Sequence, residues 1–137
     1  MAYCISRVDY FYTNVRDEPG EAYRLLKQLA ALRISLTAFA AVPFGPDLTQ
    51  LTLFPEDTPQ LVEAAKRANM KLDGPYPAIL VTGDDQLGAL APIHEKLAQA
   101  HVNVYASTGV VGARGGFGYV IYIRPDQFPQ AAAVLNV

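Results

Sequence analysis

The second half of the chain repeats the pattern of the first half, and this internal repeat is the strongest constraint on the fold. A shift of 68 positions aligns acidic, glycine and aliphatic residues in one register. The aligned pairs are Asp17 with Asp85, Gly20 with Gly88, Leu25 with Ile93, Leu29-Ala30 with Leu97-Ala98, Ile34-Ser35-Leu36 with Val102-Asn103-Val104, Ala38 with Ala106 and Val42 with Val110. Two extra residues, placed in the following hairpin, then align Pro55 with Pro125 and Pro59-Gln60 with Pro129-Gln130. The chain is therefore expected to hold two copies of one small unit.

Over residues 3–81, hydrophobic periodicity predicts the order strand, helix, strand, strand, helix, strand. Aromatic and β-branched residues, or alternation with period 2, mark the strands at residues 3–13, 34–38, 49–54 and 78–81. An apolar stripe after Gly20 marks the first helix, with Arg33 in its last turn. The second helix is expected to begin with Thr58 as N-cap and Pro59 at the first helical position.

A unit with this order folds as a four-stranded antiparallel sheet with both helices on one face, which is the α+β ferredoxin-like arrangement. We expect the first unit over residues 1–74 and the second over residues 75–137. The second copy reaches Val137 without an obvious fourth strand. One interpretation is that the N-terminal residues, which exceed what the first strand needs, take that place.

Composition excludes several classes of function. Hydrophobic residues make up 51% of the chain and charged residues 18%, which favours a packed globule over disorder. The net charge of −2 disfavours nucleic acid as a partner. Cys4 is the only cysteine, so an internal disulfide or a cysteine metal cluster is not expected. Without a signal-like start or an apolar run of about 18 residues, the sequence predicts a soluble, cytoplasmic protein with no membrane segment.

The stretch Asp17-Glu18-Pro19-Gly20 separates the first strand from the first helix. A helix N-terminus has backbone N–H groups without intrahelical acceptors, and these groups can hold an anion. The corresponding stretch of the second copy is Asp85-Gln86-Leu87-Gly88, in which the proline is missing. Two interpretations stay open for Asp17 and Glu18, because they can cap the helix, contact a ligand or do both.

These motifs, in this order, resemble the ACT domain, a regulatory module. The resemblance is carried by the Asp-x-Pro-Gly opening of the first helix and by a polar residue between two aliphatics, which is Ser35 in the first copy and Asn103 in the second. It covers nearly the whole chain, although the second copy departs from it at Gln86 and Leu87. The duplication makes the chain similar to a tandem ACT protein.

The resemblance implies that paired modules bind an amino acid or a similar small metabolite and form an eight-stranded sheet. It implies one pocket between Asp17–Gly20 and Asn103, and another between Asp85–Gly88 and Ser35. It further implies a metabolic enzyme as partner, with no catalytic residue, cofactor or metal in this chain. The alternatives are an oligomerisation module or a regulatory subunit without a ligand of its own. A small enzyme is disfavoured, because no nucleophile–base pair or metal-ligand spacing occurs and Asp84 and Asp85 would point apart.

Three further features of the sequence bear on the site and on the assembly. His94 lies on the apolar stripe of a helix and is expected to be partly buried and hydrogen-bonded. Residues 109–118 are rich in glycine, but a strand follows them rather than a helix, so a hairpin with Arg114 at its tip is expected instead of a phosphate loop. Aromatic residues should face the open side of the sheet and favour a homodimer. These residues are Phe39, Tyr105, Tyr122 and either Tyr10 or Tyr12.

Overall fold

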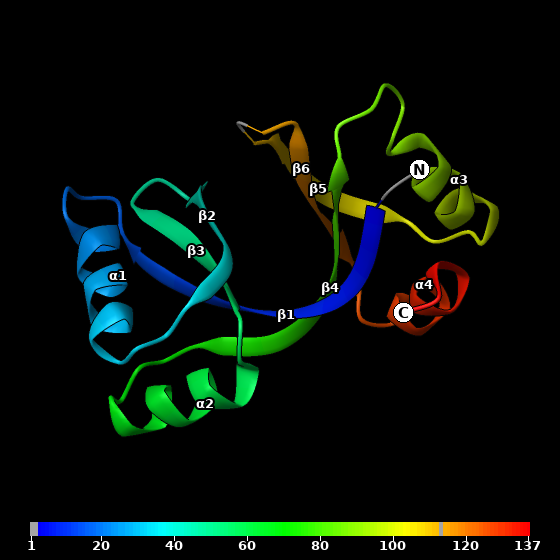
Figure 1. Ribbon diagram of the computed structural model, residues 1–137. Coiled ribbons are helices and arrows are strands. Elements are labelled where there is room, and N and C mark those ends of the chain that lie inside the picture. The colour runs from blue at the N-terminus through cyan, green and yellow to red at the C-terminus, as the bar shows by residue number, and fades with distance from the viewer. Residues whose placement is uncertain (1–2, 113) are drawn as a thin grey trace. The chain divides into compact units, whose positions relative to one another are not determined.

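The computed structural model describes residues 3–112 and 114–137, and these residues form an α+β fold (Figure 1). They contain six strands and four helices. In chain order the elements are β1 (Tyr3–Arg16), α1 (Glu21–Ala31), β2 (Leu36–Phe44), β3 (Leu48–Pro55), α2 (Thr58–Arg67), β4 (Asp73–Asp84), α3 (Ala91–Gln99), β5 (Val104–Val111), β6 (Gly116–Ile123) and α4 (Phe128–Leu135). The predicted fold class and the alternation of strands and helices are confirmed.

The chain divides into two compact units. The contiguous unit is Asp9–Tyr76, and the split unit combines Met1–Val8 with Pro77–Val137. The strand order is β2-β3-β1-β4 for the contiguous unit and β1-β4-β6-β5 for the split unit. The described residues form six strands instead of the predicted eight, because β1, of 14 residues, and β4, of 12 residues, each supply a strand to both units.

The core of the contiguous unit lies between its helices and one face of its strands. Phe11 of β1 and Leu53 of β3 pack with Leu29 of α1 and Leu61 of α2. All four side chains are at most 3% exposed. The stripe after Gly20 therefore forms a helix because it gives α1 one apolar face to bury.

The core of the split unit has the same construction. Ile79 of β4 and Ile121 of β6 are fully buried with Ile93 of α3 and with residues of α4. Tyr3 and Ile5 of β1 pack against this cluster. The first residues of β1 thus contribute apolar side chains to a core that is otherwise built from the second half of the sequence.

The register of strand pairing repeats with the offset of 68 that the sequence shows. Ala41 pairs with Leu51 in the first hairpin, and Gly109 pairs with Tyr119 in the second. Gly109 lies 68 positions after Ala41, and Tyr119 lies 68 positions after Leu51. The predicted place of the two extra residues, in the hairpin, is wrong. β6 ends 68 positions beyond β3, but α4 begins 70 positions beyond α2, so the extra residues lie between β6 and α4. A connecting loop accepts an insertion that would disturb a paired hairpin.

All four helices of the described chain end with the same backbone motif. A residue with positive φ follows each helix, and the next N–H group donates to a carbonyl five residues earlier. These donors and acceptors are Ile34 to Leu29, Met70 to Ala65, Val102 to Leu97 and Val137 to Ala132. The positive-φ residue after α1 is Arg33 (φ 61°), so its predicted place in the last turn is wrong. His101 takes the equivalent position after α3.

The start of α2 also differs from the prediction. Its N-cap is Asp57 and not Thr58, because the Asp57 carboxylate accepts the Gln60 N–H group at 3.0 Å. The Thr58 hydroxyl instead donates to the Asp9 carboxylate at 3.0 Å. Pro59 is therefore the second residue of the helix and not the first as predicted, although it still lies in the first turn.

A β-bulge changes the face on which one predicted aromatic residue lies. The register shifts between Leu36 and Ala38, so that Phe39 pairs with Leu53. Directly paired residues share a face, and Leu53 belongs to the core beneath the helices. Phe39 therefore lies on the helix-covered side, against the prediction. On the other side of the contiguous unit, Tyr10 is buried in ring contact with Phe54, Tyr12 and Tyr76.

Candidate functional site

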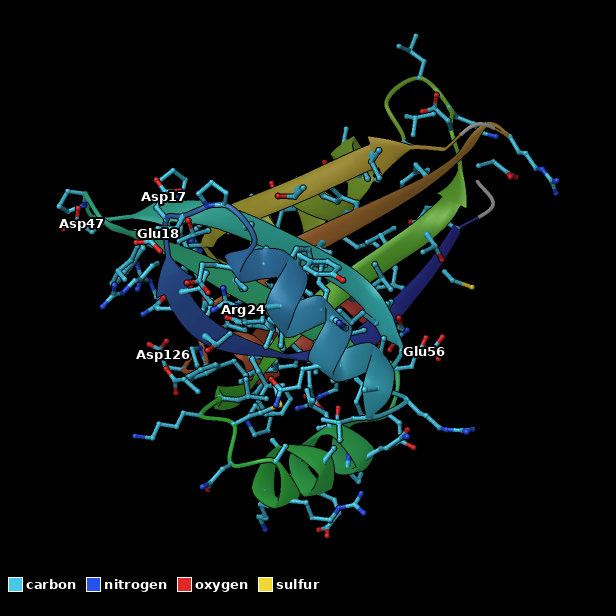
Figure 2. All side chains as sticks on the ribbon, turned by 90° about the vertical axis from the view of Figure 1, so that its left-hand side faces the viewer. Asp17, Glu18, Arg24, Asp47, Glu56 and Asp126 are labelled. Carbon is cyan, nitrogen blue, oxygen red and sulfur yellow. The ribbon has the colours of Figure 1, made fainter. Side chains whose placement is uncertain are left out.

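The two turns that precede α1 and α3 have matching backbone geometry. The first turn is residues 17–20 and the second turn is residues 85–88. Gly20 (φ 87°) and Gly88 (φ 73°) both adopt the left-handed conformation that glycine tolerates best. The Asp17 N–H group donates to the Asp47 carbonyl at 2.9 Å, and the Asp85 N–H group donates to the Gly115 carbonyl at 2.7 Å. Each turn is thereby tied to the tip of the neighbouring hairpin (Figure 2 shows Asp17, Glu18 and Asp47).

Neither turn supplies a side-chain cap to its helix. Gly20 is the N-cap of α1 and Leu90 is the N-cap of α3, and no side chain accepts a capping hydrogen bond at either position. The capping interpretation of Asp17 and Glu18 is therefore wrong. Pro19 precedes the N-cap and lies outside the first helical turn, because the helix begins only after the left-handed Gly20.

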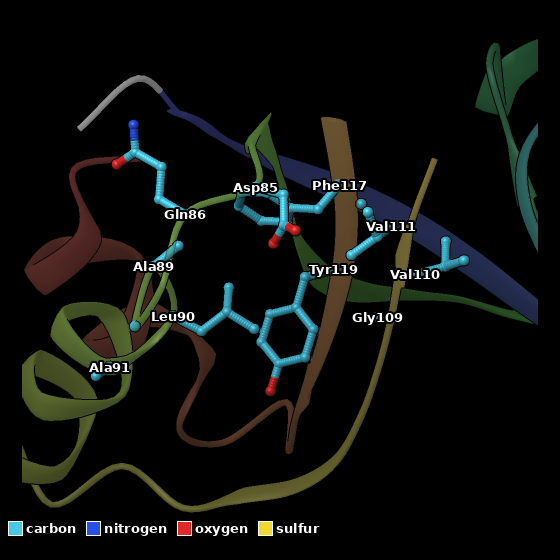
Figure 3. A pocket seen from close by; sticks show the side chains of 12 residues that line it. Asp85, Gln86, Ala89, Leu90, Ala91, Gly109, Val110, Val111, Phe117 and Tyr119 are labelled. Atoms are coloured by element: carbon cyan, nitrogen blue, oxygen red, sulfur yellow. The ribbon is translucent and has the colours of Figure 1, made fainter. Parts of the chain in front are cut away.

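A pocket of about 510 Å³ lies beside the second turn, and we call it the α3 pocket (Figure 3). Its volume falls within the range of small-molecule sites. It is lined by the second turn, the start of α3 and the ends of β5 and β6 that adjoin their hairpin. The lining residues are Asp85, Gln86, Gly88, Ala89, Leu90, Ala91, Gly109, Val110, Val111, Phe117, Gly118 and Tyr119.

One side of the α3 pocket is the ring of Tyr119, which is 8% exposed. Its hydroxyl group and His94 Nε2 are 2.7 Å apart and form a hydrogen bond. The prediction that His94 is partly buried and hydrogen-bonded is confirmed. Gly109, directly opposite on β5, leaves room for the ring, because a Cβ atom there would lie 2.8 Å from Tyr119 Cδ1. The position of Tyr119 therefore depends on a glycine in the neighbouring strand.

Asp85 is the charged residue of the α3 pocket. Within residues 3–112 and 114–137, its carboxylate takes part in no ion pair. Phe117 and Val111 line the same pocket with apolar surface (Figure 3). Leu87, which was among the predicted ligand-binding residues, is fully exposed and does not line the pocket. The pocket thus combines one carboxylate with mostly apolar walls.

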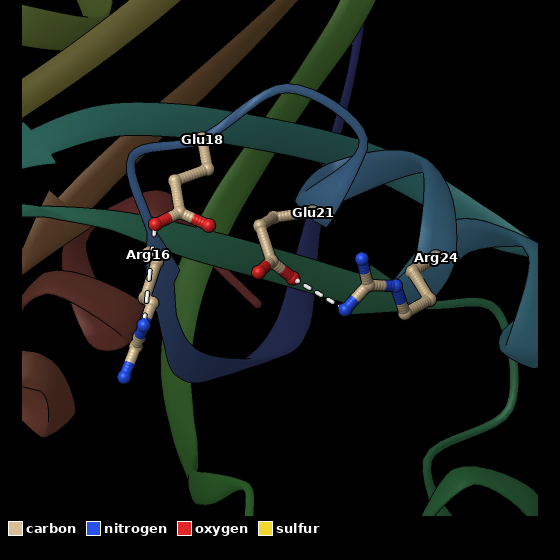
Figure 4. Close-up of polar contacts among 4 residues, drawn as sticks. All are labelled: Arg16, Glu18, Glu21 and Arg24. Atoms are coloured by element: carbon tan, nitrogen blue, oxygen red, sulfur yellow. Dashed lines mark ion pairs between the residues drawn. The ribbon is translucent and has the colours of Figure 1, made fainter.

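The first turn has a different chemical character. Glu18 pairs with Arg16 at 4.0 Å, and Glu21 pairs with Arg24 at 3.2 Å (Figure 4). The Thr49 hydroxyl donates to the Asp17 carboxylate at 3.5 Å. The depression beside this turn, about 430 Å³, is lined mainly by polar residues and faces the tip of the β2–β3 hairpin. The acidic groups around the first turn therefore already have partners within the chain.

Ser35 and Asn103, the predicted polar partners of the two turns, are exposed residues just before β2 and β5. The Ser35 carbonyl accepts the Glu56 N–H group at 2.9 Å, and the Asn103 N–H group donates to Gln127 Oε1 at 3.0 Å. Within its own unit, each lies at the opposite end of a strand from the turn. The predicted pockets pair residues of different units, and that pairing stays a prediction.

The described residues contain no group of three or more His, Cys, Asp or Glu side chains that could hold a metal ion. No helix in this part of the chain is long and apolar enough to cross a membrane. Tyr76 lies in the contiguous unit and does not line the α3 pocket. Its hydroxyl donates to the Asp73 carboxylate at 2.7 Å, and this hydrogen bond raises the Tyr76 pKa.

No family model and no curated protein matches this sequence. Solved structures do match it. A protein of Bacteroides thetaiotaomicron is 17% identical, with a TM-score of 0.75 over 98% of this chain and 88% of that one. The ligand-free regulatory subunit of aspartate kinase from Thermus thermophilus is 13% identical, with a TM-score of 0.63 over 99% and 95%. The corresponding subunit from Thermus flavus is 14% identical, with a TM-score of 0.61 over 99% and 95%.

The chain has the same fold as these two regulatory subunits. The likeness to these neighbours concerns the fold alone, and within this fold the second turn is the one beside the α3 pocket. Sequence reasoning found Asp85, Gln86 and Gly88 of that pocket but missed Gly109, Phe117 and Tyr119. The available signal was the hairpin itself, because its register places Gly109 opposite Tyr119.

Proposed function

We propose that this protein is a non-catalytic regulatory module that binds an amino acid or a similar small metabolite. The observation that carries the proposal is the α3 pocket, which has the size of a metabolite site, apolar walls and one carboxylate. The likeness to regulatory subunits of aspartate kinase supports a regulatory role. Neither turn supplies a nucleophile with an adjacent base, which is the arrangement that covalent catalysis requires.

Regulation requires that the ligand changes an equilibrium between two states. We propose that a metabolic enzyme is the partner that responds, and that the protein acts as a homodimer. The predicted pairing of Asp85–Gly88 with Ser35, and of Asp17–Gly20 with Asn103, would join paired units across such a site.

An oligomerisation module without a ligand is the second candidate, and the exposed edge strands favour it. Val42 and Phe44 of β2 are 49% and 48% exposed, and Val110 and Val111 of β5 are 71% and 55% exposed. Apolar side chains on an unpaired strand edge are typical of a surface that associates.

A ligand screen on the full chain separates the two candidates. A bound ligand raises the melting temperature by mass action, so thermal-shift measurements over the common amino acids and related metabolites should find at least one that stabilises the protein. Isothermal titration calorimetry then gives the affinity. A folded protein that binds no member of the panel, and that still associates with itself, would support the oligomerisation module instead.

A further inference from the structure

We propose that the chain has one ligand site and not two, that this site is the α3 pocket, and that it selects a primary ammonium group attached to a large apolar body. This inference rests on the proposed function and adds the stoichiometry and the ligand class. It starts from the unequal chemistry of two turns that have the same backbone geometry.

The offset of 68 positions identifies what the first copy has in place of each pocket residue. Phe117 corresponds to Thr49, whose hydroxyl donates to the Asp17 carboxylate. Ala89 corresponds to Glu21, which pairs with Arg24. The first copy therefore has polar residues at two positions where the second copy has apolar residues that line the α3 pocket. Each of these polar residues bonds to a partner within the first copy.

The charge of the α3 pocket favours a cation. Asp85 corresponds to Asp17, but Phe117 offers it no hydrogen bond in place of the Thr49 hydroxyl. Gln86 and Ala89 replace the two glutamates of the first copy and bring no further charge. A ligand ammonium group beside Asp85 would form a charge-assisted hydrogen bond, which is the stronger kind of polar contact.

The start of α3 offers little to an anion. The Ala91 N–H group donates to the Gly88 carbonyl at 3.2 Å, and Pro92 has no N–H group. Two of the donors with which a helix start usually holds a carboxylate are therefore missing. We conclude that a ligand carboxylate contributes little at this site, unlike the ammonium group.

The apolar part of the pocket determines the body of the ligand. Leu90, Val111 and Phe117 present apolar side chains, and the Tyr119 ring is held by Gly109 and His94. Such walls accept an aromatic or branched group. A small side chain of the ligand would leave the walls exposed to water, and a charged side chain would be buried against them at a cost.

The test uses calorimetry on the full chain with three related probes. These are phenylalanine, phenethylamine, which lacks the carboxylate, and phenylpropanoate, which lacks the ammonium group. We expect phenylalanine and phenethylamine to bind with one site per chain. We expect phenylpropanoate to bind at least about tenfold more weakly, because it loses a charge-assisted hydrogen bond.

Matched substitutions locate the site. Asp85→Asn should weaken phenethylamine binding by about tenfold or more, whereas Asp17→Asn, at the equivalent position of the first copy, should change it by less than about twofold. Asp126→Asn changes an exposed aspartate of the split unit outside the pocket and controls for net charge. Unchanged melting temperatures of the three unliganded variants would show that the fold is retained.

Several outcomes would overturn the inference and leave the proposed function standing. These are two sites per chain, loss of binding in Asp17→Asn but not in Asp85→Asn, or tight binding of phenylpropanoate alone. The same holds if phenethylamine fails to bind while another metabolite of the wider panel stabilises the protein. If no metabolite binds, the proposed function fails as well.

Discussion

The unequal roles of Asp57 and Asp17 give a direct test of how the helices begin. Asp57 is the N-cap of α2, and its carboxylate accepts the Gln60 N–H group at 3.0 Å. Replacing such a cap by alanine costs about 1 kcal/mol of stability. Asp17 also precedes a helix, but it lies three residues before the N-cap of α1, and its carboxylate accepts a long, exposed hydrogen bond of 3.5 Å from the Thr49 hydroxyl. Exposed substitutions of this kind change stability by less than about 0.5 kcal/mol.

We therefore expect Asp57→Ala to lower the free energy of unfolding by about 1 kcal/mol and Asp17→Ala to leave it nearly unchanged. For a chain of this length the first change corresponds to a fall in melting temperature of about 4 °C. Urea denaturation followed by circular dichroism and by tyrosine fluorescence measures the effect, and coincident transitions would justify a two-state treatment. A loss in Asp17→Ala as large as that in Asp57→Ala would refute this account of the first turn.

Three further substitutions probe other contacts. Gly74→Ala should destabilise the protein by about 2 kcal/mol in denaturant melts, since a Cβ atom would lie 2.8 Å from a carbonyl oxygen of β1 and φ is +148°; a neutral result would contradict the close approach. Tyr119→Phe should cost about 1 kcal/mol through the lost bond to His94, and unchanged stability would argue against that bond. Because the hydrogen bond to Asp73 raises the pKa of Tyr76, this bond stabilises the folded protein fully below a pH of about 10. The stabilisation is lost as the pH rises through the raised pKa of the folded state. Tyr76→Phe should therefore be less alkali-sensitive than the wild type, and identical alkaline melting curves would count against the bond.

Much of the fold could be predicted because hydrophobic periodicity depends on local sequence. The stripe that includes Leu29 and the alternation around Leu53 mark faces that become buried together. The offset of 68 appears both in the residues and in the strand register. The β-bulge near Leu36 could not be predicted in this way, because strict alternation assigns faces without it, and Phe39 was therefore placed on the wrong face.

The candidate site was predicted less completely than the fold. Asp85 and Gly88 were found because they repeat a motif of the first copy. Phe117 and Tyr119 were missed because a pocket wall depends on which strands are neighbours, and the glycine-rich stretch was assigned only to a hairpin. From the sequence, the second turn differs from the first by its missing proline. For the chemistry of the site, the more important difference is that Phe117 of the second copy takes the place of Thr49, which bonds to Asp17 in the first copy.

The division of β1 between the two units has a consequence for the order of folding. Asp9–Tyr76 is continuous in sequence, so this unit can complete its contacts as soon as the ribosome has released it. The other unit must bring Tyr3 and Ile5 together with residues of α3 and α4, across most of the chain. Closing so long a loop is slow, which places the contacts of Tyr3 and Ile5 among the last to form.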